Sequence, residues 1–205
     1  MLMPTFFDDR RPHNGWTYDE YRDQWTDRAE ASMKDKDRSE RKMLHYLRYN
    51  LDRQAGVHNA YEPSPNLRQV IDAIDAPQVW MVLTEPWCGD SSFVLPVIAE
   101  AAALSDQITL RILPRDEHLD IMDQYLTNGS RSIPKLVVFS EDGTEQFEWG
   151  PRPESAAALY ARLKKEYDDK SKSVKKLIEH YEEGGWKDVE AELVDALKNT
   201  VSAPA

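Results

Sequence analysis

The sequence predicts an α/β fold in which helices cover a central mixed β-sheet, with further helices at both ends of the chain. An apolar run at 79–83 and alternating apolar residues at 108–113 flank a stretch of helical spacing, the pattern of a βαβ unit with two parallel strands. Runs at 136–139 and 145–149 flank Asp142-Gly143, a turn signal typical of an antiparallel hairpin. Together these segments predict a mixed sheet.

The segments on either side of this sheet are expected to be helical. Residues 17–55 carry an aromatic stripe at helical spacing (Tyr18, Tyr21, Trp25). The breakers between Gly56 and Pro65 predict a linker, and 66–74 predicts a short helix. A helix is expected at 117–126, and the helix at 153–167 is expected to close the core. Two more amphipathic helices are expected at 171–183 and 186–198, outside that core.

These expectations divide the chain into three parts. They are an N-terminal helical extension (1–60), an α/β domain (64–168) and a C-terminal helical extension (169–205).

Composition and charge exclude several classes of function. The formal net charge of the 205 residues is −11, and residues 1–53 hold 11 basic and 11 acidic residues, so the excess lies after them. Such a chain repels phosphate backbones, which argues against binding to nucleic acid or anionic membranes. One cysteine permits no internal disulfide, and neither a signal peptide nor an apolar stretch of membrane-spanning length is evident. We therefore expect a cytoplasmic protein.

The single cysteine, Cys88, lies where the strand at 79–83 gives way to a helix. Free backbone N–H groups and the helix dipole lower the pKa of a thiol at such a junction, and the thiolate is the reactive form. Asp90 opposes this effect, because its negative charge beside the sulfur disfavours the thiolate. Ser91, one helical turn on, is expected to donate a hydrogen bond to the thiolate, or to be an ordinary first-turn serine. The alternative for Cys88 itself is a buried structural cysteine.

At these residues the sequence resembles the thioredoxin superfamily. Trp87-Cys88-Gly89-Asp90-Ser91 is similar to the family's W-C-G-P-C motif, with Asp90 in place of the proline and Ser91 in place of the second cysteine. Pro96 stands where the family has a proline inside its active-site helix, and Gly150 matches a late glycine. Ile133-Pro134, followed by the apolar run that ends at Phe139, resembles the strand that the family begins with a cis-proline. The resemblance covers roughly half the chain.

The resemblance implies a substrate-binding surface around Cys88. Pro134 is expected to be cis and to face the thiol, leaving the backbone of Ile133 to pair with an extended peptide or a thiol-bearing cofactor. Trp87 and Gly89 belong to the same expected surface. Arg131 and Arg152 are expected to lie on this face and receive a carboxylate; the alternative is that both are merely solvated.

One departure from the family concerns proton transfer. Val82 stands where thioredoxins keep a buried Asp, and from the sequence Glu85 is expected to be exposed. No metal site is expected, because the five histidines form no suitably spaced pair. No cofactor is expected beyond a low-molecular-weight thiol as co-substrate.

Three functions remain open at this stage. The first is a monothiol thiol–disulfide oxidoreductase in which Cys88 takes a small thiol from a mixed disulfide on a protein. The second is a redox-inactive module that binds a partner in the groove at Ile133-Pro134. The third is a glutathione-dependent iron–sulfur carrier, because C-G-D-S partly matches the C-G-x-S of single-cysteine glutaredoxins. Their glycine-rich glutathione-binding segment is not evident. The expected partners are protein thiols or disulfides, or a small thiol.

Overall fold

The computed structural model describes residues 3–201, with side chains as far as Thr200. Its four-stranded sheet has the order β2-β1-β3-β4. The strand bounds are β1 Gln78–Thr84, β2 Ile108–Pro114, β3 Lys135–Ser140 and β4 Glu145–Trp149. β1 pairs with β2 in parallel and with β3 antiparallel, and β3 pairs antiparallel with β4. The predicted mixed sheet and α/β fold class are confirmed.

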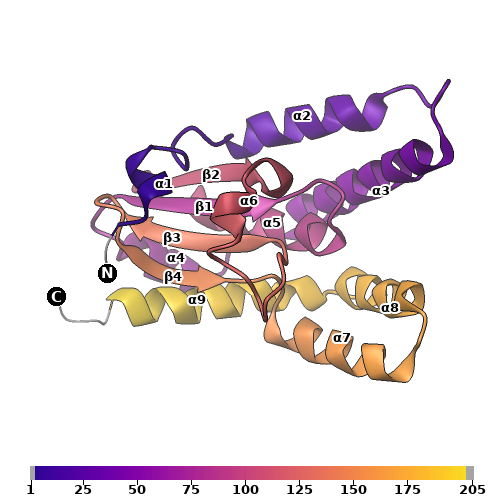
Figure 1. Cartoon of the computed structure of the whole chain (residues 1–205). Helices are drawn as coiled ribbons and strands as arrows, with labels where there is room; N and C mark the ends of the chain where they lie inside the picture. Colours follow the sequence, from indigo (N-terminus) through magenta and orange to yellow (C-terminus); the bar gives the residue numbers. More distant parts are fainter. Residues whose placement is uncertain (1–2, 202–205) are drawn as a thin grey trace.

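The helices occupy both flanks of this sheet and both ends of the described chain (Figure 1). They are α1 Thr5–Asp8, α2 Tyr18–Glu30, α3 Arg38–Ala60, α4 Pro65–Asp72, α5 Gly89–Ala102, α6 Leu119–Met122, α7 Glu154–Glu166, α8 Lys170–Glu182 and α9 Asp188–Val201, with 3-10 turns η1 Arg115–Glu117 and η2 Gly185–Lys187. None of these helices is long and apolar enough to cross a membrane, within the residues that the structure describes.

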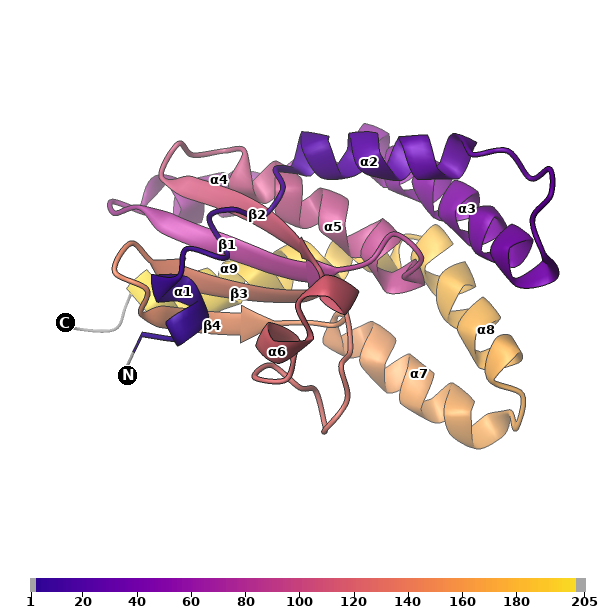
Figure 2. The ribbon, with the colours of Figure 1, turned by 45° about the horizontal axis from the view of Figure 1, so that its top comes forward.

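The alternation of side chains along the strands gives the sheet two apolar faces. On one face, Met81, Leu83 and Val137 pack with residues of α1 and α6. On the other, Trp80 and Val138 pack with α4, α5 and α9. Figure 2 shows α1 and α6 in front of the sheet and α4, α5 and α9 behind it.

The helix that completes the core is α9, not the helix expected at 153–167. Leu193 and Leu197 of α9 are fully buried against the main core, and the Trp149 indole of β4 donates a 2.7 Å hydrogen bond to Glu192. The expected closing helix is α7, which buries only Ala156 and Leu163 and forms a hairpin with α8. The division of the chain at 60, 64 and 168 stays a prediction. α9 falls in the predicted C-terminal extension, yet it packs in the same core as the sheet.

The N-terminal helices begin at strong capping signals. Thr17 and Glu20 form a capping box at α2, and Asp37 and Glu40 form another at α3. These two boxes divide the expected 17–55 helical segment into two helices. The expected linker from Gly56 is wrong for its first half, because α3 continues to Ala60, where one glycine costs a packed helix only about 1 kcal/mol.

The expected helix at 117–126 is also shorter in the structure. α6 covers only four residues and is followed by a turn in which Thr127 and Ser130 exchange backbone hydrogen bonds of 2.9 and 3.1 Å. This turn forms one wall of a polar groove beside the cis-proline loop.

Two helical hairpins, α2–α3 and α7–α8, extend past the same end of the sheet, beside the start of α5 (Figures 1 and 2). The first hairpin bonds to the loop between β1 and α5, and the two hairpins bond to each other. The amide of Asn50 in α3 donates a 3.0 Å hydrogen bond to the Pro86 carbonyl, and Arg53 of α3 pairs with Glu182 of α8 at 3.4 Å. Cys88 therefore lies between the two hairpins.

Candidate active site around Cys88

Cys88 is the N-cap residue of α5. Its backbone is extended (φ −77°, ψ 120°), and its N–H donates a 3.0 Å hydrogen bond to the Glu85 carbonyl, which closes the turn after β1. The helix begins at Gly89, so the sulfur lies beside backbone N–H groups that lack a partner within the helix. Pro96 lies inside α5 as expected.

The thiol faces the cis-proline loop. The Ile133–Pro134 peptide bond is cis, as expected, and the Cys88 Sγ–H donates to the Ile133 carbonyl oxygen at 3.2 Å. A carbonyl oxygen accepts this bond only from the protonated sulfur, so the contact stabilises the thiol over the thiolate. A partner that pairs with the Ile133 backbone would have to displace this bond and would thereby free the sulfur.

The resting thiol is weakly acidic. Burial, and after it the Asp90 carboxylate, raise the pKa of the Cys88 thiol to about 11, although hydrogen bonds from Ser91 and from the backbone N–H groups of Asp90 and Ser91 lower it. The expectation that the helix start leaves a low pKa is therefore wrong for this conformation, because 8% exposure costs the thiolate more hydration than the helix returns. The direction expected for Asp90 agrees with the structure.

Asp90 is the centre of a partly buried charge network. Arg152 donates two hydrogen bonds to its carboxylate, at 3.0 and 2.6 Å, and the Tyr181 hydroxyl donates a third at 2.9 Å. Burial lowers the pKa of Arg152, but the Asp90 charge more than offsets this, so the guanidinium stays charged. Burial and then Asp90 raise the pKa of Tyr181, so its hydroxyl stays protonated.

Helix α8 covers this network and one side of the active-site turn. The Tyr181 ring stacks on Phe93 with centroids 4.9 Å apart, and the Ile178 side chain lies so close to Gly89 that a Cβ there would be 3.0 Å from it. Tyr181 and Ile178 were not among the predicted site residues. Their apolar stripe in the sequence indicates a buried face, but no local signal says that this face lies on Cys88.

Ser91 and its neighbours form a buried polar cluster under the thiol. The Ser91 hydroxyl accepts a 2.6 Å hydrogen bond from Thr84 and keeps its own hydrogen for Cys88. Val82 is fully buried, and because its side chain is apolar this position supplies no acid. Glu85 is 5% exposed, not exposed as expected, because the Asp116 backbone N–H reaches its carboxylate at 2.9 Å.

The remaining predicted site residues lie around this centre with differing partners. The Trp87 ring is half-buried beneath the Arg115 guanidinium, 4.8 Å from the ring centroid. Arg131 is exposed and pairs with Asp123 at 2.6 and 2.8 Å, while Arg152 pairs with Asp90. Both arginines thus bind carboxylates of their own chain. Their role toward a substrate stays a prediction.

Gly150 fixes how closely β4 approaches the cis-proline. Its φ is +111°, and a Cβ at this position would lie 2.3 Å from the Pro134 carbonyl oxygen. Only glycine combines this backbone angle with so short an approach.

Among residues 3–200, no three His, Cys, Asp or Glu side chains converge as metal ligands would.

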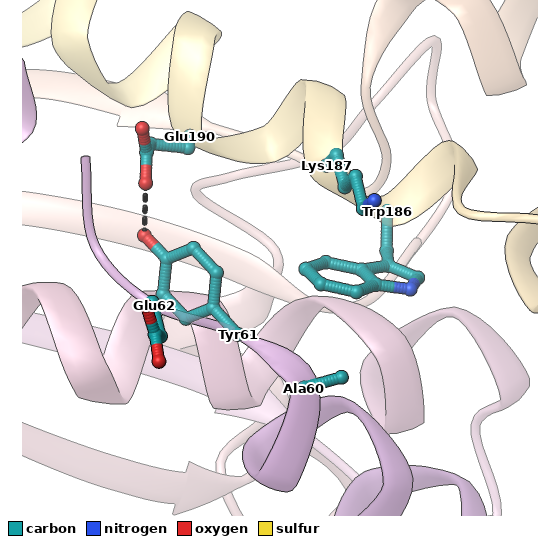
Figure 3. Close-up of a pocket in the computed structure, with 6 residues that line it drawn as sticks. All are labelled: Ala60, Tyr61, Glu62, Trp186, Lys187 and Glu190. Atoms are coloured by element: carbon teal, nitrogen blue, oxygen red, sulfur yellow. Dashed lines mark hydrogen bonds between the residues drawn. The ribbon is translucent and has the colours of Figure 1, made fainter.

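A separate hollow lies between the end of α3 and the start of α9 (Figure 3). There the Tyr61 hydroxyl donates a 2.5 Å hydrogen bond to Glu190, and the Tyr61 ring meets Trp186 edge to face. Glu190 also accepts from the Ser64 backbone N–H at 3.2 Å. These bonds attach α9 to the chain that leads into α4, so we assign this hollow a structural role.

The four-stranded sheet, the cysteine at the start of α5 and the cis-proline opposite it define a thioredoxin-like protein. Residues 22–181 match the Thioredoxin_9 family, described as Thioredoxin, and the chain belongs to that family. No curated protein matches the chain.

Two solved structures share the fold. A crystal structure of an HIV epitope-scaffold is 16% identical with a TM-score of 0.56; the match covers 90% of this chain and 99% of the other. PA1234, a protein of unknown function from Pseudomonas aeruginosa, is 18% identical with a TM-score of 0.51; here the match covers 88% and 99%.

Proposed function

We propose that this protein is a monothiol thiol–disulfide oxidoreductase that acts through Cys88. The observation that carries the proposal is the position of the sulfur, at the start of α5 and 3.2 Å from the carbonyl that precedes the cis-proline. A partner that pairs with the Ile133 backbone would lie beside Sγ.

The reaction needs one cysteine only. The Cys88 thiol gives up its proton and attacks the small-thiol sulfur of a protein mixed disulfide, so that a new S–S bond forms and the protein leaves as a thiol that takes up a proton. A second small thiol then attacks the Cys88 mixed disulfide. Free Cys88 thiol is regenerated, and the small molecule leaves as its symmetrical disulfide.

The pKa of Cys88 makes the reaction slow but does not prevent it. At a pKa of about 11, the thiolate fraction at neutral pH is about a hundredfold lower than for an ordinary thiol. A thiolate of higher pKa is also the stronger nucleophile, so each Cys88 thiolate reacts about tenfold faster than an ordinary one. The net loss of rate is therefore about tenfold. A disulfide held beside Sγ would offset the remaining loss, because effective molarities of oriented reactants are large.

Mass spectrometry of the intact protein tests the proposal. Oxidised glutathione at pH 7.5 is expected to add one glutathionyl group to Cys88, and excess reduced glutathione is expected to remove it. Cys88→Ser is the control and should gain no mass. If Cys88 gains the group only after unfolding in urea, the oxidoreductase proposal is wrong.

The second candidate is a binding module without redox turnover, and the buried, protonated thiol favours it. In that case Cys88→Ser would retain partner binding at the cis-proline loop. Wild-type Cys88 would then resist alkylation at pH 7.5 on the time scale on which a free thiol reacts completely.

A further inference from the structure

A polar groove of about 870 Å³ opens beside the cis-proline loop. One wall is the turn at 127–132, the other is the exposed face of α7 with the start of α8, and Gly150–Arg152 form the end nearest the site. We call it the α7 groove. Its volume is within the range of small-ligand sites. Ser132 lines it and directly precedes Ile133, whose carbonyl accepts the Cys88 hydrogen bond.

The α7 groove is positively charged in a part of the chain that is acidic overall. Lys164 and Lys170 line it, and neither has a carboxylate partner in the described part of the chain. Arg152 lies at its end, with its charge shared with Asp90. Asp168 is the acidic residue in the lining. The excess positive charge favours an anionic occupant.

An aromatic ring lies beside these cations. Tyr160 lines the groove, and the Arg152 guanidinium and the Lys164 ammonium lie 4.6 and 5.2 Å from its ring centroid. The groove therefore combines an aromatic side chain with positive charge.

We propose that the α7 groove binds an anionic, peptide-sized thiol or its disulfide, with carboxylates near Lys164 and Lys170 and sulfur toward Cys88. This inference rests on the proposed oxidoreductase function and specifies its small-thiol substrate. Cys88 attacks the bound disulfide, one half remains on Cys88, and the other half leaves as a thiol carrying a proton.

Two disulfides of nearly equal size test the charge preference. One is oxidised glutathione, and the other is the disulfide of glutathione ethyl ester, which lacks the glycyl carboxylates. Rates of mixed-disulfide formation at Cys88 are divided by the rates with N-acetylcysteine, which removes differences in intrinsic reactivity. We expect a several-fold preference for oxidised glutathione. The net charge of −11 by itself predicts the opposite order, because it repels the anion.

Matched charge variants locate the effect. Lys164→Glu/Lys170→Glu and Lys165→Glu/Lys172→Glu each replace two lysines by two glutamates, which takes the net charge from −11 to −15 in both. Lys165 and Lys172 are exposed on the same two helices but do not line the groove. The first variant should lose the preference, and the second should keep most of it. Equal ratios in both variants would overturn the proposal.

A binding measurement separates this inference from the proposed function. S-Methylglutathione cannot form a disulfide, so its binding to the wild-type protein, followed by calorimetry at low salt, does not require a reactive Cys88. Saturable binding that only the groove variant loses supports the α7 groove even if Cys88 proves inert. Absence of binding, together with normal disulfide chemistry at Cys88, leaves the oxidoreductase and removes the groove.

Discussion

Asp90 and Arg152 are joined by two hydrogen bonds, at 3.0 and 2.6 Å, across 62 residues of chain. The side chains are 12% and 18% exposed, so the pair is shielded from solvent one residue beyond the Cys88–Gly89 turn. The guanidinium offsets part of the negative charge that the carboxylate places beside the thiol. Arg152, in the loop between β4 and α7, thereby limits how far Asp90 raises the pKa of the Cys88 thiol.

Asp90→Asn is expected to make Cys88 more reactive and the fold less stable. Removing the carboxylate charge lowers the pKa of the thiol below about 11, and each pKa unit raises the alkylation rate at pH 8 about threefold, since nucleophilicity falls as the thiolate fraction rises. The unpaired Arg152 costs about 3 kcal/mol. The pH dependence of iodoacetamide alkylation and urea unfolding measure the two effects. Asp123→Asn, which removes an exposed partner of Arg131, is the control and should change neither.

Two substitutions of Tyr181 separate the effect of its hydrogen bond to Asp90 from the effect of its ring in covering Cys88. Tyr181→Phe removes the bond to Asp90, keeps the ring on Phe93 and costs about 1 kcal/mol. Tyr181→Ala also removes the ring, costs about 3–5 kcal/mol and should speed alkylation of Cys88 well below the unfolding transition. Equal alkylation rates in Tyr181→Ala and wild type would show that α8 does not limit access to the sulfur.

The sequence predicts local features of the fold well and distant contacts poorly. The run Val79–Leu83 indicates the central strand β1, because burial on both faces leaves a continuous apolar run. The alternation of Ile108, Leu110 and Ile112 indicates β2, which lies at the edge of the sheet. The position of Cys88 follows from the same local pattern. In contrast, α7 and α9 both carry apolar stripes, and only tertiary packing shows that α9 covers the sheet.

The electrostatics of the site depend on such distant contacts. The acidity of Cys88 is controlled less by its own helix than by burial, to which α8 contributes from about 90 residues away through Tyr181 and Ile178. Glu85 is likewise buried, with the Asp116 N–H bound to its carboxylate and the charge of Arg28 from α2 acting on it. No pattern near either residue encodes these neighbours.

At Gly150, even the methyl group of alanine is expected to destabilise the fold. In Gly150→Ala the methyl group would lie 2.3 Å from the Pro134 carbonyl oxygen at a φ of +111°. The strand or the cis-proline loop must therefore shift, at a cost of about 3 kcal/mol or more. Gly129→Ala is the matched control, because its φ is +75° but nothing lies within 4 Å, and it should cost about 1 kcal/mol. Thermal unfolding of both variants distinguishes the clash from the backbone angle; equal losses would rule out the clash.

Glu85 gives the protein a testable pH dependence. Burial, only partly offset by the hydrogen bond from the Asp116 N–H, raises the pKa of Glu85 in the folded state. Asp116 also raises it, while Arg28 and Arg115 lower it. A raised folded pKa means that the folded protein binds this proton more tightly than the unfolded chain does. The contribution of Glu85 to stability is therefore fully present below the unfolded pKa of about 4.3 and is lost as pH rises through the folded pKa.

Glu85→Gln keeps an oxygen that can accept from the Asp116 N–H but cannot ionise. We expect it to be more stable than wild type at pH 7.5, by about 1.4 kcal/mol for each unit by which folding raises the pKa. The difference should shrink as pH falls and vanish near pH 4. Urea unfolding across this range measures it, with the exposed Glu141→Gln as control. If Glu85→Gln is instead the less stable protein at pH 7.5, the ionised carboxylate contributes more through its hydrogen bond and the nearby arginines than its burial costs.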